Sequence, residues 1–123
     1  MKIKQLSVFV ENKTGRINEV TQILGSNGVN MTAFSLADSG EFGILRMIVS
    51  DVGRAVSALK EARFGISVTE VVCFCCPNEP GALSIVLDCL ARENVFIEYM
   101  YAFIAVSGQH AFVVFRVNDN AKT

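Results

Sequence analysis

The sequence predicts an α+β fold in which one structural unit occurs twice, and two observations carry this prediction. The first is an internal repeat: NKTGRINEVTQILGSNGVNM, residues 12–31, aligns without a gap to NEPGALSIVLDCLARENVFI, residues 78–97. The second is that the copies combine alternating apolar residues, which are typical of strands, with apolar residues at helical spacing. A repeat that keeps its order, its spacing and its turn residues indicates a duplication.

The first copy begins with a predicted half-buried strand, because apolar and other residues alternate over residues 6–10. Residues 12–15 have the composition of a turn, and the apolar residues that follow recur at the spacing of an amphipathic helix. Gly28 fits the left-handed position that ends this helix, and Asn94 stands at the matching place in the second copy. Two strands then follow, at residues 29–37 and 42–50, around the turn DSGE.

The end of the first copy completes the pattern. Asp51 is predicted to cap a second helix that ends at Gly65. The strand 66–76 closes the first copy and, by the repeat alignment, opens the second. The order strand, helix, strand, strand, helix, strand predicts a ferredoxin-like plait, in which two helices cover one face of a four-stranded antiparallel sheet. We place the first domain at residues 1–70 and the second at residues 71–123.

The second copy is incomplete in this sequence. SGEFGILRMIVSD, residues 39–51, pairs with SGQHAFVVFRVND, residues 107–119, after two extra residues in the second copy. The first copy continues through a helix and a strand, whereas only four residues follow Asp119. We expect an unpaired sheet edge and an uncovered apolar face, which favour association into at least a dimer. The alternative is that elements of the first copy cover this face within one chain.

The glycine that follows the first strand of each copy is a more specific signal. The segments ENKTGRI and PNEPGAL make the chain similar to the ACT domain family, small regulatory modules that bind amino acids. The family pattern of Asp or Asn, two variable residues often ending in Pro, then Gly and an apolar helix is met by Asn78, Pro80 and Gly81. The first copy has Thr14 where Pro is usual. The resemblance covers nearly the whole chain and extends to small bacterial proteins made of two ACT domains.

Elementary chemistry supports an amino-acid site at these corners. A glycine allows a ligand to approach the backbone closely, and the N-terminus of the helix behind it favours a carboxylate. The amide oxygen of an asparagine can accept hydrogen bonds from the ligand's ammonium group. The predicted ligand-binding residues are Asn12, Thr14, Gly15, Arg16, Asn30 and Met31 in the first copy, and Asn78, Pro80, Gly81 and Ala82 in the second. The alternative is that Asn and Gly only make a good corner.

The resemblance implies a particular role for Asn30 and Met31, which begin the second strand. In ACT proteins the ligand typically lies where the first loop of one domain faces the strands of a partner domain, so these two residues would form the opposite wall. Phe96 replaces Asn30 in the second copy, and therefore the two sites need not be equivalent.

The cysteines in CFCCPNEPGAL, residues 73–83, could instead indicate a metal or redox site. In an extended strand Cys73 and Cys75 point to one face and Cys76 to the other, so three thiolates cannot converge on one metal. Cys89 lies on the following helix. Plaits of the copper-chaperone kind carry their cysteine pair in the first loop, which here reads PNEPG. We expect the cysteines to pack in the core and no metal, and keep a metal-binding plait as an alternative.

Composition limits the remaining functions. The chain has 11 basic and 12 acidic residues and no basic run, so nucleic acid and membrane are poor partners. The N-terminus resembles a strand rather than a signal peptide, which predicts a cytoplasmic protein with reduced thiols. The lone histidine, His110, has no evident nucleophile arranged around it, so we expect no catalysis and no cofactor.

We therefore predict a non-enzymatic protein that binds an amino acid and reports it to a metabolic enzyme or pathway through altered association. The second hypothesis is a structural or oligomerisation module with vestigial ligand sites.

Overall fold

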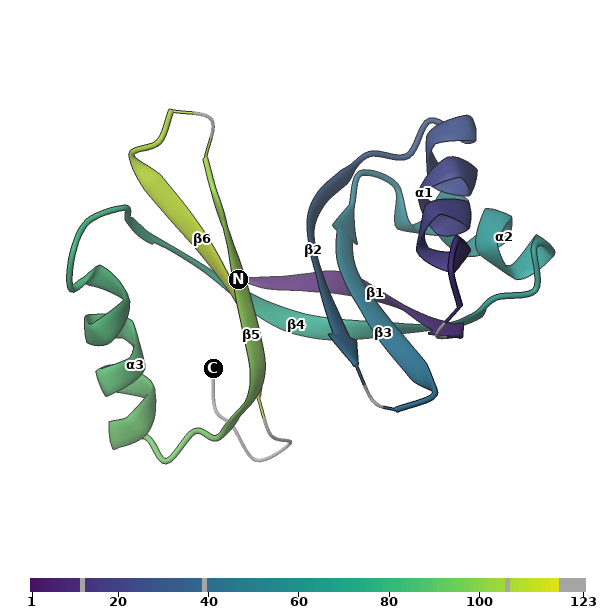
Figure 1. The fold of residues 1–123 in the computed structure, drawn as a ribbon. Coiled ribbons are helices and arrows are strands. Elements are labelled where there is room, and N and C mark those ends of the chain that lie inside the picture. The colour runs from purple at the N-terminus through teal and green to yellow at the C-terminus, as the bar shows by residue number, and fades with distance from the viewer. Residues whose placement is uncertain (12, 39, 106, 118–123) are drawn as a thin grey trace. The chain divides into compact units, whose positions relative to one another are not determined.

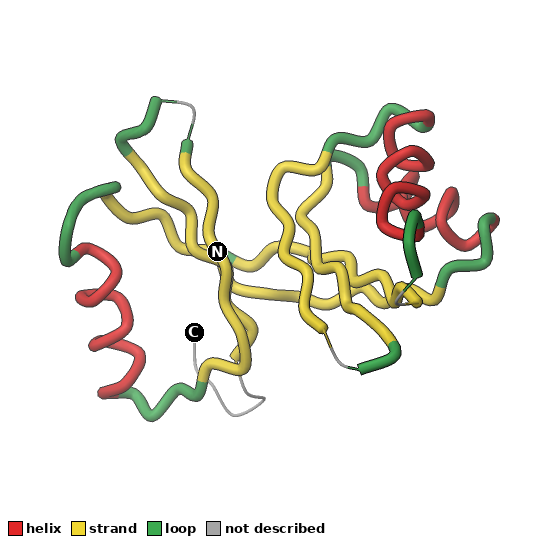
Figure 2. Tube along the Cα trace, viewed as in Figure 1, coloured by secondary structure: helices red, strands yellow, loops and turns green. Residues whose placement is uncertain are grey.

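The computed structural model describes residues 1–11, 13–38, 40–105 and 107–117, and it confirms the predicted α+β fold of ferredoxin-like plaits (Figures 1 and 2). The elements are β1 (Lys2–Glu11), α1 (Arg16–Ser26), β2 (Met31–Asp38), β3 (Phe42–Val49), α2 (Val52–Glu61), β4 (Gly65–Pro77), α3 (Ala82–Arg92), β5 (Ile97–Ile104) and β6 (His110–Val117). Contacts divide the chain into two compact units. The first unit is Lys4–Thr69, and the second consists of Met1–Ile3 with the residues from Glu70 onward.

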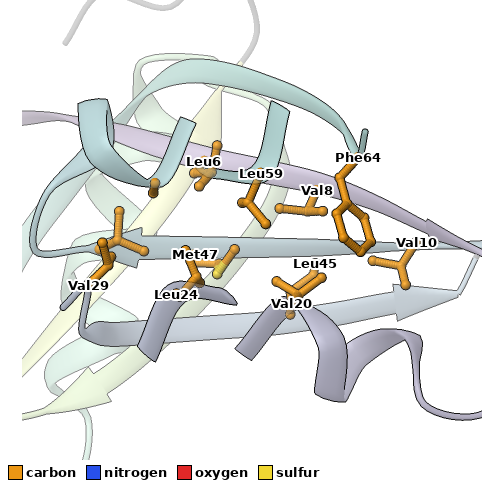
Figure 3. Close-up of a cluster of buried hydrophobic side chains, with 12 residues drawn as sticks. Leu6, Val8, Val10, Val20, Leu24, Val29, Leu45, Met47, Leu59 and Phe64 are labelled. Atoms are coloured by element: carbon orange, nitrogen blue, oxygen red, sulfur yellow. The ribbon is translucent and has the colours of Figure 1, made fainter. Parts of the chain in front are cut away.

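The first unit is a complete plait. Its strands follow the order β2-β3-β1-β4, and β3 is antiparallel to both of its neighbours. The helices α1 and α2 cover one face of this sheet, where side chains from strands and helices meet (Figure 3). The buried cluster consists of Leu6, Val8, Val10, Val20, Leu24, Val29, Leu45, Met47, Val49, Ala55, Leu59 and Phe64. Full burial of one such aliphatic side chain contributes about 1.5–3 kcal/mol, so this cluster holds the unit together.

The second unit follows the strand order β1-β4-β6-β5 with a single described helix, α3. The first residues of β1 lie at the edge of β4: the Cys73 N–H donates to the Met1 carbonyl at 2.8 Å, and the Met1 amine donates to the Cys73 carbonyl at 3.3 Å. The expectation of an unpaired edge beside β4 is therefore wrong, because a segment of the first strand occupies it, as the alternative anticipated. The domain limits 1–70 and 71–123 remain a prediction.

The helices α1, α2 and α3 are each followed by a residue in the left-handed conformation. After α1 the N–H groups of Gly28 and Val29 return to carbonyls of the last turn at 3.1 and 2.9 Å, and Gly28 has φ 70°. Arg63 and Asn94 hold the same left-handed position after α2 and α3, with φ 67° and 57°. This confirms the predicted helix ends at Gly28 and Asn94. The prediction that Gly65 ends the second helix is wrong, because that residue begins β4.

The start of α2 is held as predicted. The Asp51 side chain accepts a hydrogen bond from the Arg54 backbone N–H at 3.1 Å, which satisfies one free donor of the first turn. The Arg54 guanidinium in turn donates to the Asn27 carbonyl at 3.3 Å, at the C-terminal end of α1. These bonds join the beginning of one helix to the end of the other, so α1 and α2 are positioned as a pair.

The four cysteines are free thiols in two different environments. Cys73 and Cys76 are buried, and Cys76 packs with Val113 and Phe115 in the core of the second unit. Burial also raises the pKa of the Cys73 thiol above its ordinary value, although the nearby N-terminal ammonium partly opposes this. Cys75 and Cys89 are exposed, so the prediction of core packing is wrong for these two. Alternation along a strand sets the face of a side chain but not whether that face is covered.

We predict that Arg63→Gly stabilises the protein by roughly 0.5–1 kcal/mol. A left-handed L-residue costs about 1–2 kcal/mol, which glycine avoids. Glycine also loses more conformational entropy on folding, which offsets about 0.5–1 kcal/mol of that stabilisation. The urea midpoint at unchanged m-value measures the effect. Ala62→Gly is the matched control, because Ala62 has φ −82°, and it should destabilise. A destabilised Arg63→Gly protein would contradict the strain argument.

We also predict that a chromogenic disulfide reagent at neutral pH modifies Cys75 and Cys89 quickly in the native protein. Cys73 and Cys76 should react only after unfolding, because their thiols are buried and a raised pKa leaves little thiolate at Cys73. Cys75→Ser and Cys89→Ser should each remove one fast thiol. Fast reaction at Cys73 in the double variant would show that this segment opens readily.

Candidate functional site

Both predicted glycine corners have the same backbone geometry. Gly15 and Gly81 precede α1 and α3 with φ 89° and 85°, a left-handed conformation in which an L side chain is strained. A Cβ atom built on either glycine would have no neighbouring atom within 4 Å. Glycine is therefore required by the backbone rather than by crowding, and the space beside each corner is open to a small molecule.

The N-terminal turn of α1 is a suitable place for a negatively charged group. Among the residues that the structure describes, no side-chain hydrogen bond caps the helix at Gly15, whose carbonyl accepts the Glu19 N–H at 3.0 Å. The N–H groups at the start of an α-helix lack intrahelical partners and carry the positive end of the helix dipole. Thr14 is exposed beside this turn. Asn12, predicted to bind the ligand, lies outside the described residues.

A cavity of about 290 Å³ lies between the end of β1, the start of α1 and the neighbouring ends of β2 and β3. Its lining combines aliphatic side chains with charged groups of both signs. The lining residues are Val10, Glu11, Lys13, Ile17, Leu36, Ala37, Asp38 and Gly43. The Lys13 ammonium lies 3.1 Å from a Glu11 carboxylate oxygen, and both side chains are largely exposed. The cavity can thus offer charged partners at its rim and apolar contacts inside.

Arg16, a predicted ligand contact, makes several contacts within the protein. Its guanidinium lies 2.5 Å from a Glu19 carboxylate oxygen and 3.9 Å from one of Glu11. It also stacks over the Phe64 ring at 4.4 Å from the ring centre. Arg16 does not line the cavity. Its contacts instead hold the start of α1 against the core, so Arg16 helps to position the turn without contacting the cavity.

Asn30 and Met31 lie far from this corner in the first unit. In the antiparallel sheet Met31 pairs with Val49, whereas Glu11 pairs with Phe42 at the other end of β3. The Asn30 N–H donates to the Ser50 hydroxyl at 2.9 Å, and Met31 packs partly against the core. Within the first unit, therefore, Asn30 and Met31 do not line the cavity at the β1–α1 corner. Their role as a wall of a neighbouring domain's site remains a prediction.

The corner of the second unit is tied to a hairpin. The Asn78 side-chain amide donates to the Gly108 carbonyl at 2.9 Å, and its backbone N–H donates to the Gln109 carbonyl at 2.8 Å. Pro80 is exposed and Ala82 is half-buried beside it. The nitrogen of the Asn78 amide therefore holds the loop in place, and only its oxygen could accept a bond from a ligand.

Sequence reasoning located the corner but missed most of the cavity. Leu36, Asp38 and Gly43 come from the next two strands and reach the corner only through strand pairing. One local signal could have indicated Gly43, which is the second residue of β3. A glycine inside a strand often marks a close approach by a ligand or by another backbone segment.

Other kinds of site find less support in the described ranges. There, no group of three or more His, Cys, Asp or Glu residues lies close enough to hold a metal ion. His110 is exposed at the start of β6. None of the helices α1, α2 and α3 is long and apolar enough to cross a membrane.

Comparison with known proteins identifies the family. The family model described as an ACT domain pair matches residues 1–123. The structure of protein BT0572 from Bacteroides thetaiotaomicron is 49% identical over 97% of this chain and 81% of that chain, with a TM-score of 0.90. The ligand-free regulatory subunit of aspartate kinase from Thermus thermophilus is 16% identical over 91% of this chain and 81% of that chain, with a TM-score of 0.66.

The second of these structures shares the fold alone, given its low identity. Among curated proteins, none matches the chain. Because the family model spans the whole chain and the structure has the expected plaits, this protein belongs to the ACT domain pair family.

Proposed function

We propose that the protein is a non-enzymatic regulator that binds an amino acid at the corner between β1 and α1. The observation that carries this proposal is the cavity of about 290 Å³ beside a left-handed glycine and a helix N-terminus that no described side chain caps. Membership in the ACT family supports it, as does the fold shared with a regulatory subunit of aspartate kinase. Binding of an amino acid would be linked to an enzyme of amino-acid metabolism through altered association.

The corner offers complementary groups to both ends of an amino acid. The ligand carboxylate would lie at the first turn of α1, near Gly15 and Thr14, with Lys13 as a charged partner. The ammonium would lie near the carboxylates of Glu11 and Asp38. Asn12 is proposed as a further oxygen acceptor, and Arg16 would act by holding the helix start in place.

The corner of the second unit is proposed as a further ligand contact through Asn78, Pro80, Gly81 and Ala82. It has the same backbone turn, but its asparagine amide is bonded to Gly108. The two sites therefore need not bind with equal affinity.

We further propose that the protein acts as a homo-oligomer, at least a dimer, in the cytoplasm. Asn30 and Met31 would then complete the site of a neighbouring domain. The four free thiols suit a reducing compartment. Large apolar side chains on the edge strand β2 support association: Phe34 and Leu36 are 62% and 57% exposed. The same observation favours the second candidate function, an oligomerisation module with vestigial sites.

The substitution Gly15→Ala tests the ligand site. It places a methyl group in the open corner, and we expect amino-acid binding measured by calorimetry to weaken by at least about tenfold, or about 1.4 kcal/mol. Gly28→Ala is the matched control, because Gly28 also has a left-handed backbone, with φ 70°, but lies at the other end of α1, where a Cβ atom would make only an ordinary contact at 3.7 Å. Both variants should lose similar stability, and only Gly15→Ala should lose binding. If Gly15→Ala bound the amino acid with the affinity of the parent protein, the ligand could not lie at this corner.

A screen of the twenty amino acids by thermal unfolding separates the two candidate functions. A ligand that binds only the native state raises its stability, so the regulator should show a specific rise in Tm with one class of amino acid. The oligomerisation module should show none.

Light scattering at micromolar concentration tests association. We expect at least twice the chain mass of 13.4 kDa, and a change in the distribution of species when the ligand found in the screen is added. Phe34→Glu should shift the protein toward the monomer, because it places a charge on the apolar edge. A stable monomer with and without ligand would contradict the proposed mode of regulation.

A further inference from the structure

We infer that the cavity of the first unit selects an amino acid with an uncharged aliphatic side chain. This inference rests on the proposed function and names the class of ligand for the same site. Three features of the cavity carry it: a glycine in strand β3, an aliphatic floor, and a charged rim that fits a zwitterion but not a second charge.

The glycine is Gly43, which opens the cavity by lacking a side chain. It pairs with Val10 of β1 on one side and with Asp38 of β2 on the other. Its backbone is not left-handed, so an L-residue would be tolerated there. A Cβ atom at this position would lie 3.3 Å from Leu36 Cδ1 and 3.6 Å from the Ala37 carbonyl oxygen. Any side chain here would therefore fill part of the cavity that the ligand is to occupy.

The floor of the cavity is aliphatic. Val10 is buried, Ile17 is half-buried at the start of α1, and Leu36 lies over Gly43 from the edge strand. None of these side chains can form a hydrogen bond, so a polar ligand side chain would lose its water without compensation. The volume of about 290 Å³ is at the lower end for ligand pockets, which suits one small amino acid rather than a nucleotide.

The rim carries one positive and two negative side chains, those of Lys13, Glu11 and Asp38. One oxygen of Asp38 accepts the Gly40 N–H at 3.1 Å, and Asp38 lines the cavity from the end of β2. A zwitterion can place its ammonium by Asp38 and its carboxylate by Lys13. The net negative rim disfavours a ligand with a second carboxylate, since two acidic side chains would repel it.

The second unit lacks the glycine and the charged rim. In the repeat alignment Ala111 replaces Gly43 and Glu79 replaces Lys13. In the strand pairing Ile104 is opposite Ala111, as Asp38 is opposite Gly43. Ala111 packs against the core of its unit, so its methyl group occupies the corresponding place. The expected stoichiometry for an aliphatic amino acid is therefore one per chain, bound in the first unit.

Titration calorimetry on the full chain tests the inference. The probes are L-valine, L-isoleucine and L-leucine, compared with L-aspartate, L-lysine and L-phenylalanine. We expect one of the aliphatic amino acids to bind best, at one site per chain. Isoamylamine and 4-methylpentanoate, which each lack one charged group of leucine, should bind at least about tenfold more weakly than the amino acid, because both charges are recognised.

Variants at Gly43 then locate the side-chain pocket. Gly43→Ala should weaken binding at least about tenfold and Gly43→Val should abolish it, while circular dichroism and Tm show a folded protein, since valine suits a strand. Gly65→Ala is the control: it also lies in a strand without a left-handed backbone, and its Cβ would contact Phe9 at 3.7 Å, away from the cavity. It should bind as the parent does.

The other outcomes are distinguishable. Binding of an acidic, basic or aromatic amino acid in preference to the aliphatic ones overturns the inference and leaves the proposed function standing. Aliphatic binding that is unchanged in folded Gly43→Val also overturns it, because the ligand then lies elsewhere. If none of the twenty amino acids binds the parent protein, both the inference and the proposed function fail.

Discussion

The first unit depends on the sharp turn that joins β1 to α1. The connection between the two elements is short, and the chain must reverse direction between them so that Val20 and Leu24 can pack on the sheet. This reversal uses a left-handed residue, Gly15, which carries no side chain. The turn that lets the core form therefore also leaves an open corner and a helix N-terminus that no described side chain caps. Structure and candidate site arise from one backbone constraint.

The edge strand β2 exposes an apolar side chain beside this corner. Leu36 pairs with Leu45 and shares its face of the sheet, yet Leu36 is exposed because it belongs to the edge strand. In the second unit the turn is the same, but none of the residues of α3 is buried, and Asn78 binds the hairpin beside it. The duplication thus preserved the backbone of the corner while the surrounding side chains diverged.

Much of the fold could be predicted from local sequence. The helical spacing of apolar residues and the Asp51 cap depend on residues within a few positions of one another, and the structure confirms them. The predicted half-buried strand is wrong around Leu6, because Gln5 and Ser7 are buried together with Leu6 and Val8. The left-handed conformation of Arg63 was not predicted, because residue type alone disfavours it. The strain is offset by the burial of the next residue, Phe64, whose core contacts come from distant parts of the chain. The pairing of Met1 with Cys73 joins residues at opposite ends of the repeat unit, which no local pattern indicates.

The same division applies to the candidate site. By itself the sequence determined the duplicated plait and the two glycine corners, because strand alternation, helix periodicity and turn chemistry act over short distances along the chain. Only the tertiary structure decided that Leu36, Asp38 and Gly43 stand beside the first corner. It also decided that Arg16 contacts Phe64. The physical reason is that strand pairing and burial depend on contacts between distant segments, and these contacts select which side chains meet.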